Sequence, residues 1–379
     1  MRYRRMPIEA ESPEQMGYEK IRNNLSESSY TDAILRDFDT GAGLGDLILC
    51  YGSHQGHEGL RDHIARDAAG SVREGAGLDR EDVLLTIGAA GALFIIATTL
   101  LEKEDELIVV RPNYANNIET PRAIGATIRY IDLVFEEGFA LDIAKVRTAI
   151  SGKTKFISVT HPHNPTGACL DRTQLEQLVR LAEEKDIRLL VDETYRDMVF
   201  GEQLPLAATL SPRVISISSL SKTYGLPGLR VGWIVCRDAA LMEEFLAAKE
   251  QIHICGPILD EELAFRYLLH RATHFARIKV GIREKFNLVK QWMQGEEAWE
   301  WVEPKGGCVC FPRLRASRDV DMQRFYRILL ERYGTYVGAG HWFEMPSHYM
   351  RIGFGWPSIQ QLEDGLQGLS DARREASRP

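Results

Sequence analysis

Short apolar runs recur through the middle of the chain, and longer stretches of mixed polarity separate them. Each run is rich in Val, Ile and Leu and is a few residues long, which is typical of strands buried in a sheet. The predicted buried strands are Val83–Thr86, Glu106–Val110, Thr127–Ile131, Lys155–Thr160, Arg188–Val191, Val214–Ile217 and Val231–Cys236.

The stretches between these runs have the pattern of helices. In residues 171–185 the leucines fall on one helical face, and Asp171 and Gln174 form a capping pair at its start. Strands that alternate with helices predict an α/β fold, with a large doubly wound, mostly parallel sheet of seven strands covered on both faces. Ligands in such sheets bind beyond the carboxyl ends of the strands.

The pattern changes after residue 258, where a long amphipathic stretch reaches Trp292 and predicts helices that lead into a second unit. This unit has the pattern of an α+β cap, and the N-terminal segment is expected to pack with it. We therefore predict a large domain at residues 36–280 and a small domain made of residues 1–35 and 281–379. The elements expected in the cap are a strand within 304–311, a helix within 321–333 and a strand within 349–353.

Composition narrows the classes of partner. The chain has 379 residues, 44% of them hydrophobic and 26% charged, as in an ordinary globular protein. A net charge of −8 argues against nucleic acid or an anionic membrane as a partner, because both require a basic face. The six cysteines are scattered through apolar runs and are predicted to be reduced and structural.

Two segments bear on location. Val83–Leu101 has no charged residue, but its glycines divide it into a strand, a turn and a buried helix, so we do not expect it to span a membrane. The basic residues 1–6 are not followed by an apolar core, so no signal peptide is predicted. We expect a cytoplasmic enzyme.

The sharpest chemical candidate is Lys222, in the glycine-rich connection between the last two predicted strands. A lysine amine forms a Schiff base with an aldehyde when neighbouring cations or desolvation keep it partly deprotonated. Arg230 is a candidate for such a cation and for a bidentate grip on phosphate. The alternative is a solvated loop lysine beside a surface arginine.

Further candidates follow other predicted strands. The turn that begins at Gly88, Ala89 and Ala90 opens a helix, whose free N–H groups suit a phosphate. Tyr114 is placed to stack on a flat ring, and Asn164, in Asn-Pro-Thr-Gly, can donate to a phenolate-like oxygen. The alternatives are a packing turn, a core tyrosine and an asparagine that starts a turn.

Asp192 ends another predicted strand. A buried carboxylate at that position keeps a ring nitrogen protonated, and Tyr195 can donate to the oxygen of the same ring. Arg351 alternates with apolar Met350 and Ile352, which is unusual in a strand unless its guanidinium meets an anion. A helix cap and a surface cation are the respective alternatives.

The stretch Ser219–Gly232 reads S-x-S-K-x-x-G-x-x-G-x-R-x-G and resembles the lysine motif of the pyridoxal-phosphate-dependent aminotransferases of fold type I, classes I and II. The resemblance covers nearly the whole chain. It implies that Lys222 binds the aldehyde of pyridoxal 5'-phosphate as a Schiff base, and that Ser219 and Arg230 bind the cofactor's phosphate. The family usually has a Ser or Thr where this chain has Ala89 and Ala90.

The same resemblance assigns the other candidates. Tyr114 is expected to stack on the cofactor ring, and Asn164 to contact both the ring oxygen and the substrate carboxylate. Arg351 is expected to bind the substrate α-carboxylate. Tyr51 precedes a glycine and a Leu-Arg pair and, as in the family, is expected to reach across a homodimer interface to the partner's phosphate.

Two weaker candidates lie near the N-terminus. Glu27, in the polar run Asn23–Ser29, is a candidate contact for the substrate side chain, and the run itself is predicted to be a loop. His54 and His57 are three residues apart, but no Cys or carboxylate cluster accompanies them, so surface or interface histidines are favoured over a metal site.

The predicted function is transamination between an L-amino acid and a 2-oxo acid. However, His161–Cys169, Gly225–Trp233 and Met350–Phe354 look especially like capreomycidine synthase, a family member that dehydrates and cyclises a hydroxylated arginine. A side-chain elimination or cyclisation enzyme and an arginine-directed oxidase are therefore rival predictions, with Glu27 as a guanidinium partner. A regulator that kept the fold is disfavoured by the presence of the lysine, aspartate and arginine and by the lack of a DNA-binding segment.

Overall fold

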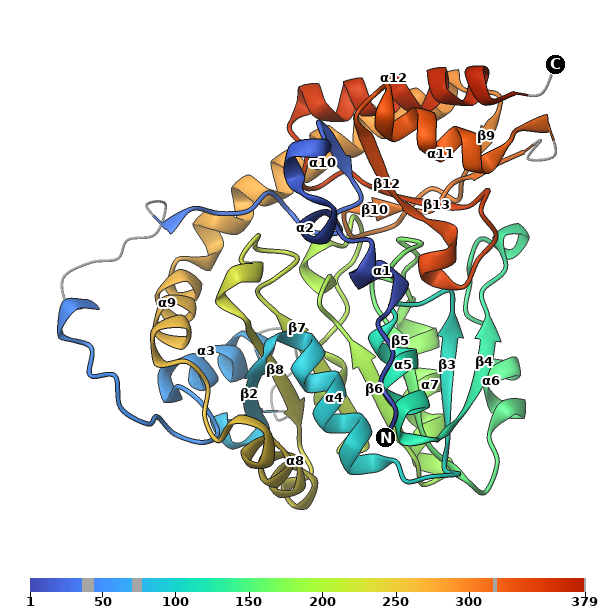
Figure 1. Ribbon diagram of the computed structural model, residues 1–379. Helices are drawn as coiled ribbons and strands as arrows, with labels where there is room; N and C mark the ends of the chain where they lie inside the picture. Colours follow the sequence, from blue (N-terminus) through green and yellow to red (C-terminus); the bar gives the residue numbers. More distant parts are fainter. Residues whose placement is uncertain (36–43, 70–76, 316–318, 378–379) are drawn as a thin grey trace.

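The structure is a computed structural model, and it describes residues 1–35, 44–69, 77–315 and 319–377. Each of the seven apolar runs forms a strand of one sheet, in the order β2-β8-β7-β6-β5-β3-β4, as predicted (Figure 1). Strand β8 runs antiparallel to both of its neighbours, and the other pairs are parallel. The bounds are β2 (Val83–Ile87), β3 (Glu106–Arg111), β4 (Thr127–Asp132), β5 (Thr154–Thr160), β6 (Arg188–Asp192), β7 (Val214–Ser219) and β8 (Val231–Cys236).

Helices cover both faces of this sheet, as the alternation of strands and helices predicts. Within β3, Ile108 belongs to a core shared with α6 and α7, whereas Leu107 and Val109 belong to a core shared with α4 and α8. This split arises because successive strand residues point to opposite faces. The helices around the sheet are α3 (Glu58–Ala69), α4 (Gly88–Leu100), α5 (Asn116–Ile124), α6 (Ile143–Ala149), α7 (Arg172–Glu184) and α8 (Ala239–His253).

Local signals set the start of α7. Asp171 accepts a hydrogen bond from the backbone N–H of Gln174, and the Gln174 side chain accepts one from the Asp171 backbone, which is the predicted capping pair.

The prediction that every strand is buried was wrong for β4, where Thr127, Arg129 and Asp132 are exposed. The physical reason is position, because β4 pairs only with β3 at the edge of the sheet.

A second sheet of four strands, in the order β1-β12-β13-β10, lies above the first and is covered by α10, α11 and α12 (Figure 1). Its strands and helices are β1 (Asn23–Leu25), β10 (Val309–Cys310), β12 (Thr335–Ala339), β13 (Met350–Gly353), α10 (Arg271–Gly295), α11 (Met322–Glu331) and α12 (Ile359–Ala376). The remaining helices and strands are α1 (Pro7–Ala10), α2 (Pro13–Met16), α9 (Ile258–Leu269), β9 (Trp299–Glu300) and β11 (Arg313–Leu314).

The polar run at Asn23–Ser29 begins as a strand, so its prediction as a loop was wrong for Asn23–Leu25. Strand β1 pairs in parallel with β12, more than 300 positions later. Asn23 and Asn24 are buried: the Asn23 amide donates to the Thr335 hydroxyl at 3.1 Å, and the Asn24 side-chain oxygen accepts from the Ser26 hydroxyl at 2.7 Å, whereas Asn24 Nδ2 has no partner among the described residues. Pairing with a distant strand therefore overrides the local turn-forming tendency.

The N-terminal segment packs with the second sheet through β1, as expected. The proposed domain boundary between residues 280 and 281 lies inside α10, which continues from the large sheet toward the small one. We keep the division into domains at 36–280 and at 1–35 with 281–379 as a proposal. None of the helices in the described part of the chain combines the length and the apolar character that a membrane span requires.

Candidate active site

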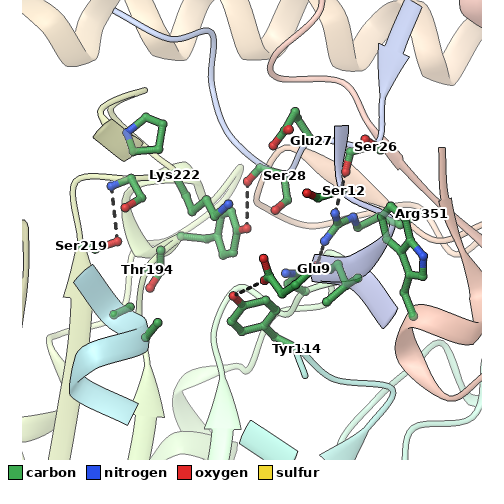
Figure 2. Close-up of a pocket in the computed structure, with 18 of the residues that line it drawn as sticks. Glu9, Ser12, Ser26, Glu27, Ser28, Tyr114, Thr194, Ser219, Lys222 and Arg351 are labelled. Atoms are coloured by element: carbon green, nitrogen blue, oxygen red, sulfur yellow. Dashed lines mark hydrogen bonds between the residues drawn. The ribbon is translucent and has the colours of Figure 1, made fainter. Parts of the chain in front are cut away.

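The predicted site residues converge on one cavity of about 190 Å³ at the carboxyl ends of the large-sheet strands, facing the small sheet (Figure 2). All of them except Gly88 and Tyr51 line this cavity. The predicted residues in its wall are Glu27, Ala89, Ala90, Tyr114, Asn164, Asp192, Tyr195, Ser219, Lys222, Arg230 and Arg351.

Gly88 lies directly behind the wall and has a structural role there. Its φ is +66°, and a Cβ atom on it would stand 2.6 Å from Nη2 of Arg230. The glycine therefore lets the guanidinium lie across the start of α4, where no side chain caps the free N–H groups. Together with the Ser219 hydroxyl in the same wall, these donors form an anion site that suits a phosphate.

Asp192 is buried at the end of β6 and accepts hydrogen bonds from Thr194, at 3.1 Å from the backbone N–H and 2.6 Å from the hydroxyl. Burial raises its pKa, and the two Thr194 bonds partly oppose that rise. In the described residues no Lys, Arg or His lies within ion-pair distance of its carboxylate. A cationic ring nitrogen in the cavity would supply the missing positive charge, so the carboxylate fits a pyridinium.

Lys222 is partly buried and belongs to the connection between β7 and β8. Its amine has no hydrogen bond or ion pair among the residues that the structure describes, whereas its backbone carbonyl accepts from the Tyr30 N–H at 2.8 Å. The backbone is thus held while the amine remains available in the cavity.

Arg351 is 3% exposed and reaches the cavity from β13 of the small sheet. Its Nη1 donates to the Asn164 side-chain oxygen at 3.0 Å and its Nη2 to the Ser26 carbonyl at 2.6 Å, but its Nε has no partner. Burial lowers its pKa. Among the described residues no carboxylate forms an ion pair with it, and a buried guanidinium in that state is a strong site for an incoming carboxylate.

The two tyrosines in the wall already have partners. The Tyr195 hydroxyl donates to the Ser28 carbonyl at 2.8 Å, and the Tyr114 hydroxyl donates to Glu9 at 3.3 Å (Figure 2). Burial raises the pKa of both phenols, so both are neutral donors. The predicted bond from Tyr195 to a ring oxygen would compete with its bond to Ser28.

Sequence reasoning missed the N-terminal part of the wall. Its members are Ile8, Glu9, Ser12, Pro13 and Glu14, from α1 and α2. Their only local signal is a proline at the first turn of each short helix. The segment is fixed by Glu11, which accepts from Trp342 Nε1 at 2.6 Å and lies 2.9 Å from His341 Nε2.

Trp342 also lines the cavity, but His54 does not. His54 and His57 contact Glu250 and Glu262, and no cluster of three or more metal-binding side chains occurs in the described residues. Tyr51 is 80% exposed and lies outside the cavity wall.

Comparison with known proteins bears on this arrangement. The family described as "Aminotransferase class I and II" matches residues 23–369. Capreomycidine synthase of Streptomyces vinaceus is 32% identical over 364 residues, which cover 93% of this chain and 90% of that protein. Arginine–pyruvate transaminase of Pseudomonas aeruginosa is 30% identical over 322 residues, which cover 81% of this chain and 80% of that protein. The crystal structure of a PLP-dependent aminotransferase from Streptococcus suis superposes with a TM-score of 0.89 at 27% identity, and covers 100% of both chains.

Proposed function

The chain belongs to the class I and II aminotransferases, and on that basis we propose that it transfers the amino group of an L-amino acid to a 2-oxo acid. Its fold is fold type I, and its cofactor is pyridoxal 5'-phosphate. The observation that carries the proposal is the buried guanidinium of Arg351, which lacks an ion-pair partner among the described residues and lines the same cavity as Lys222.

The residues in the wall fit the cofactor part by part. We propose that Arg230, Ser219 and the start of α4 hold its phosphate, that Asp192 holds its ring nitrogen and that Tyr114 lies against its ring. When bound, pyridoxal phosphate supplies an electron sink for the carbanion that forms at the substrate Cα.

The remaining chemistry belongs to the protein's own groups. Arg351 and Asn164 would bind the α-carboxylate and fix the direction of the Cα–H bond. Lys222 would then act as the general base that removes the Cα proton. Asn164 can act with Arg351 because the two side chains already share a hydrogen bond of 3.0 Å.

The test of this function is the balance of products. Incubation of the holoenzyme with L-arginine and pyruvate should give alanine and the 2-oxo acid of arginine in equal amounts, measured by mass spectrometry. With an arginine hydroxylated on its side chain as the substrate, loss of water without consumption of pyruvate would instead support the elimination or cyclisation reaction. Consumption of oxygen would support an arginine-directed oxidase. The similarity to capreomycidine synthase is the observation that favours the first of these rivals.

We propose further that the amino acid carries a positively charged side chain. Three carboxylates, those of Glu9, Glu14 and Glu27, line the cavity, and within the described residues no Lys or Arg pairs with any of them. A cationic side chain would neutralise this group while Arg351 binds the opposite, anionic end of the same substrate. The name of the arginine–pyruvate transaminase agrees with such a substrate.

Replacing one of these acids should change specificity more than rate. We expect Glu27→Gln to raise the KM for L-arginine about tenfold with little change in kcat, because a charge-assisted bond to the bound side chain is lost. The KM for L-norleucine, which has no side-chain charge, should stay within about twofold. Equal effects on both substrates would contradict a role in recognising charge.

The proposed contact between Glu27 and the cationic side chain of the substrate should depend on pH. Burial raises the pKa of Glu27, although Lys222 and Arg351 oppose the rise. As the pH falls through this raised pKa, the carboxylate gains a proton and loses its attraction for a cation. We expect the KM for L-arginine to rise at acidic pH in the wild type, and this rise to be smaller in Glu27→Gln.

Arg230 should govern affinity for the cofactor. We expect Arg230→Gln to weaken the binding of pyridoxal phosphate to the apoprotein by about 10- to 100-fold, since a charged hydrogen bond to phosphate is removed. Fluorescence titration measures this affinity. Binding of pyridoxal, which lacks the phosphate, should be equally weak in both proteins, and a loss of pyridoxal affinity in the variant would argue against a phosphate contact.

We also propose a homodimer in which Tyr51 reaches the partner's phosphate site. The support is an exposed apolar run, in which Ile48 is 76%, Leu49 79% and Tyr51 80% exposed. Sedimentation analysis of the holoenzyme should give twice the chain mass. A monomer with full activity would rule this arrangement out.

A further inference from the structure

A second, smaller cavity lies next to the strands that carry the active-site residues. Asp192 and Ser219, the last residues of β6 and β7, line the site cavity, whereas their chain neighbours Glu193 and Ser218 line the other one, of about 50 Å³. Tyr224 also lines the smaller cavity.

The Tyr224 hydroxyl joins two charged groups in this wall. It donates to Asp197 Oδ2 at 2.6 Å and accepts from Arg271 Nε at 2.7 Å. Arg271 Nη2 also pairs with Asp197 Oδ1 at 2.9 Å. The tyrosine is 5% exposed, and hydrogen bonds to charged groups are stronger than neutral ones, so its position is well fixed.

These contacts lie two residues from the active-site lysine. Between Lys222 and Tyr224, the Thr223 hydroxyl donates to the Thr194 carbonyl at 2.9 Å. Both side chains that follow the lysine therefore bind the turn that follows Asp192. Two side-chain bonds therefore help to fix the distance between the lysine loop and the turn after Asp192, and of the four residues that form them only Thr194 lines the site cavity.

We propose that Tyr224 is a positioning residue for Lys222. Through Asp197 it holds the lysine loop against the turn after Asp192, and through Arg271 it ties that loop to the first residue of α10. Because α10 continues toward the small sheet that carries Arg351, the tyrosine links the supports of the two groups that act on the substrate. Only the catalytic part of this inference rests on the proposed function.

The first test measures the loop without the reaction. In the apoprotein, we expect Tyr224→Phe to speed amide hydrogen exchange in residues 219–230 by about tenfold, measured by mass spectrometry. The matched control is Tyr333→Phe, because Tyr333 also donates to a carboxylate, that of Glu375 at 2.5 Å, but lies outside both cavity walls. The control should leave exchange in residues 219–230 unchanged.

The second test measures catalysis by the holoenzyme with L-arginine and pyruvate. A displaced lysine lowers the rate of proton transfer but leaves the α-carboxylate site intact, so kcat should fall about tenfold while KM changes less than about twofold. Asp197→Asn keeps an acceptor for the tyrosine hydroxyl but removes its charge. The loss of charge also weakens the pair with Arg271, so we expect a rise in exchange and a fall in kcat in the same direction as for Tyr224→Phe.

Unchanged exchange in residues 219–230, or an equal rise in the Tyr333→Phe control, would overturn the inference. A higher KM with unchanged kcat would do the same. If Tyr224→Phe does not accumulate as folded protein, Asp197→Asn decides, because faster exchange confined to the lysine loop supports the inference and unchanged exchange refutes it. If Tyr224→Phe speeds exchange but the wild type itself shows no aminotransferase activity, the proposed function is refuted and the positioning role remains supported.

Discussion

Replacement of Lys222 by alanine is expected to abolish covalent attachment of the cofactor and to lower kcat by at least about 10²–10⁴-fold, the range typical of losing a general base. The amine lines the cavity and has no hydrogen-bond partner among the described residues, so no other contact would be broken. Mass spectrometry after borohydride reduction checks the attachment, since the wild type should carry the cofactor on the peptide that contains Lys222.

The control for this experiment is Lys155→Ala. Lys155 is an exposed lysine that pairs with Asp105 at 3.4 Å, at the opposite end of β5 from the cavity. This variant should retain the cofactor and its activity. A Lys222→Ala protein that still binds the cofactor covalently, or a wild type that stays colourless after reconstitution, would refute the role given to this lysine.

The second large effect is expected at Arg351. Arg351→Lys should lower kcat/KM by about 10²–10³-fold, since a lysine keeps the charge but cannot form the two parallel bonds of a guanidinium to a carboxylate. The loss should appear mainly in KM if the arginine binds substrate and transition state equally. Steady-state kinetics with L-arginine measure both constants.

A substrate without the α-carboxylate provides the control for this variant. Agmatine has the side chain and amine of arginine but no carboxylate, so any slow turnover of agmatine should be equal in the wild type and in Arg351→Lys. An equal loss for both substrates would mean that Arg351 acts by holding Asn164 and Ser26 in place, rather than by binding the carboxylate. Circular dichroism of the two proteins would show whether the fold is retained.

The sequence and the structure agree best where a signal is local. All seven apolar runs became strands, because a run of Val, Ile and Leu with the right length encodes a strand by itself. The lysine stretch, the Asn-Pro-Thr-Gly turn and Asp192 each lie at the carboxyl end of a strand. Because these strands are parallel, their carboxyl ends lie on one side of the sheet, and the three groups line one cavity there. Their catalytic roles remain predictions.

Local signals failed where burial depends on position. The alternation of β4 was not foreseen, because only the strand order places it at an edge. The polar run at Asn23 gave no sign that it would be buried, since its partner, Thr335, lies on another element.

By itself, the sequence determined the seven strands of the large sheet and the candidate residues that follow them, because strand period arises from neighbouring positions. Only the tertiary structure decided that Glu9 and Glu14 join the wall, that Arg351 is buried without an ion-pair partner among the described residues, and that Tyr224 meets Arg271. These contacts join residues 47 to 325 positions apart, and no local pattern of polarity encodes such distances.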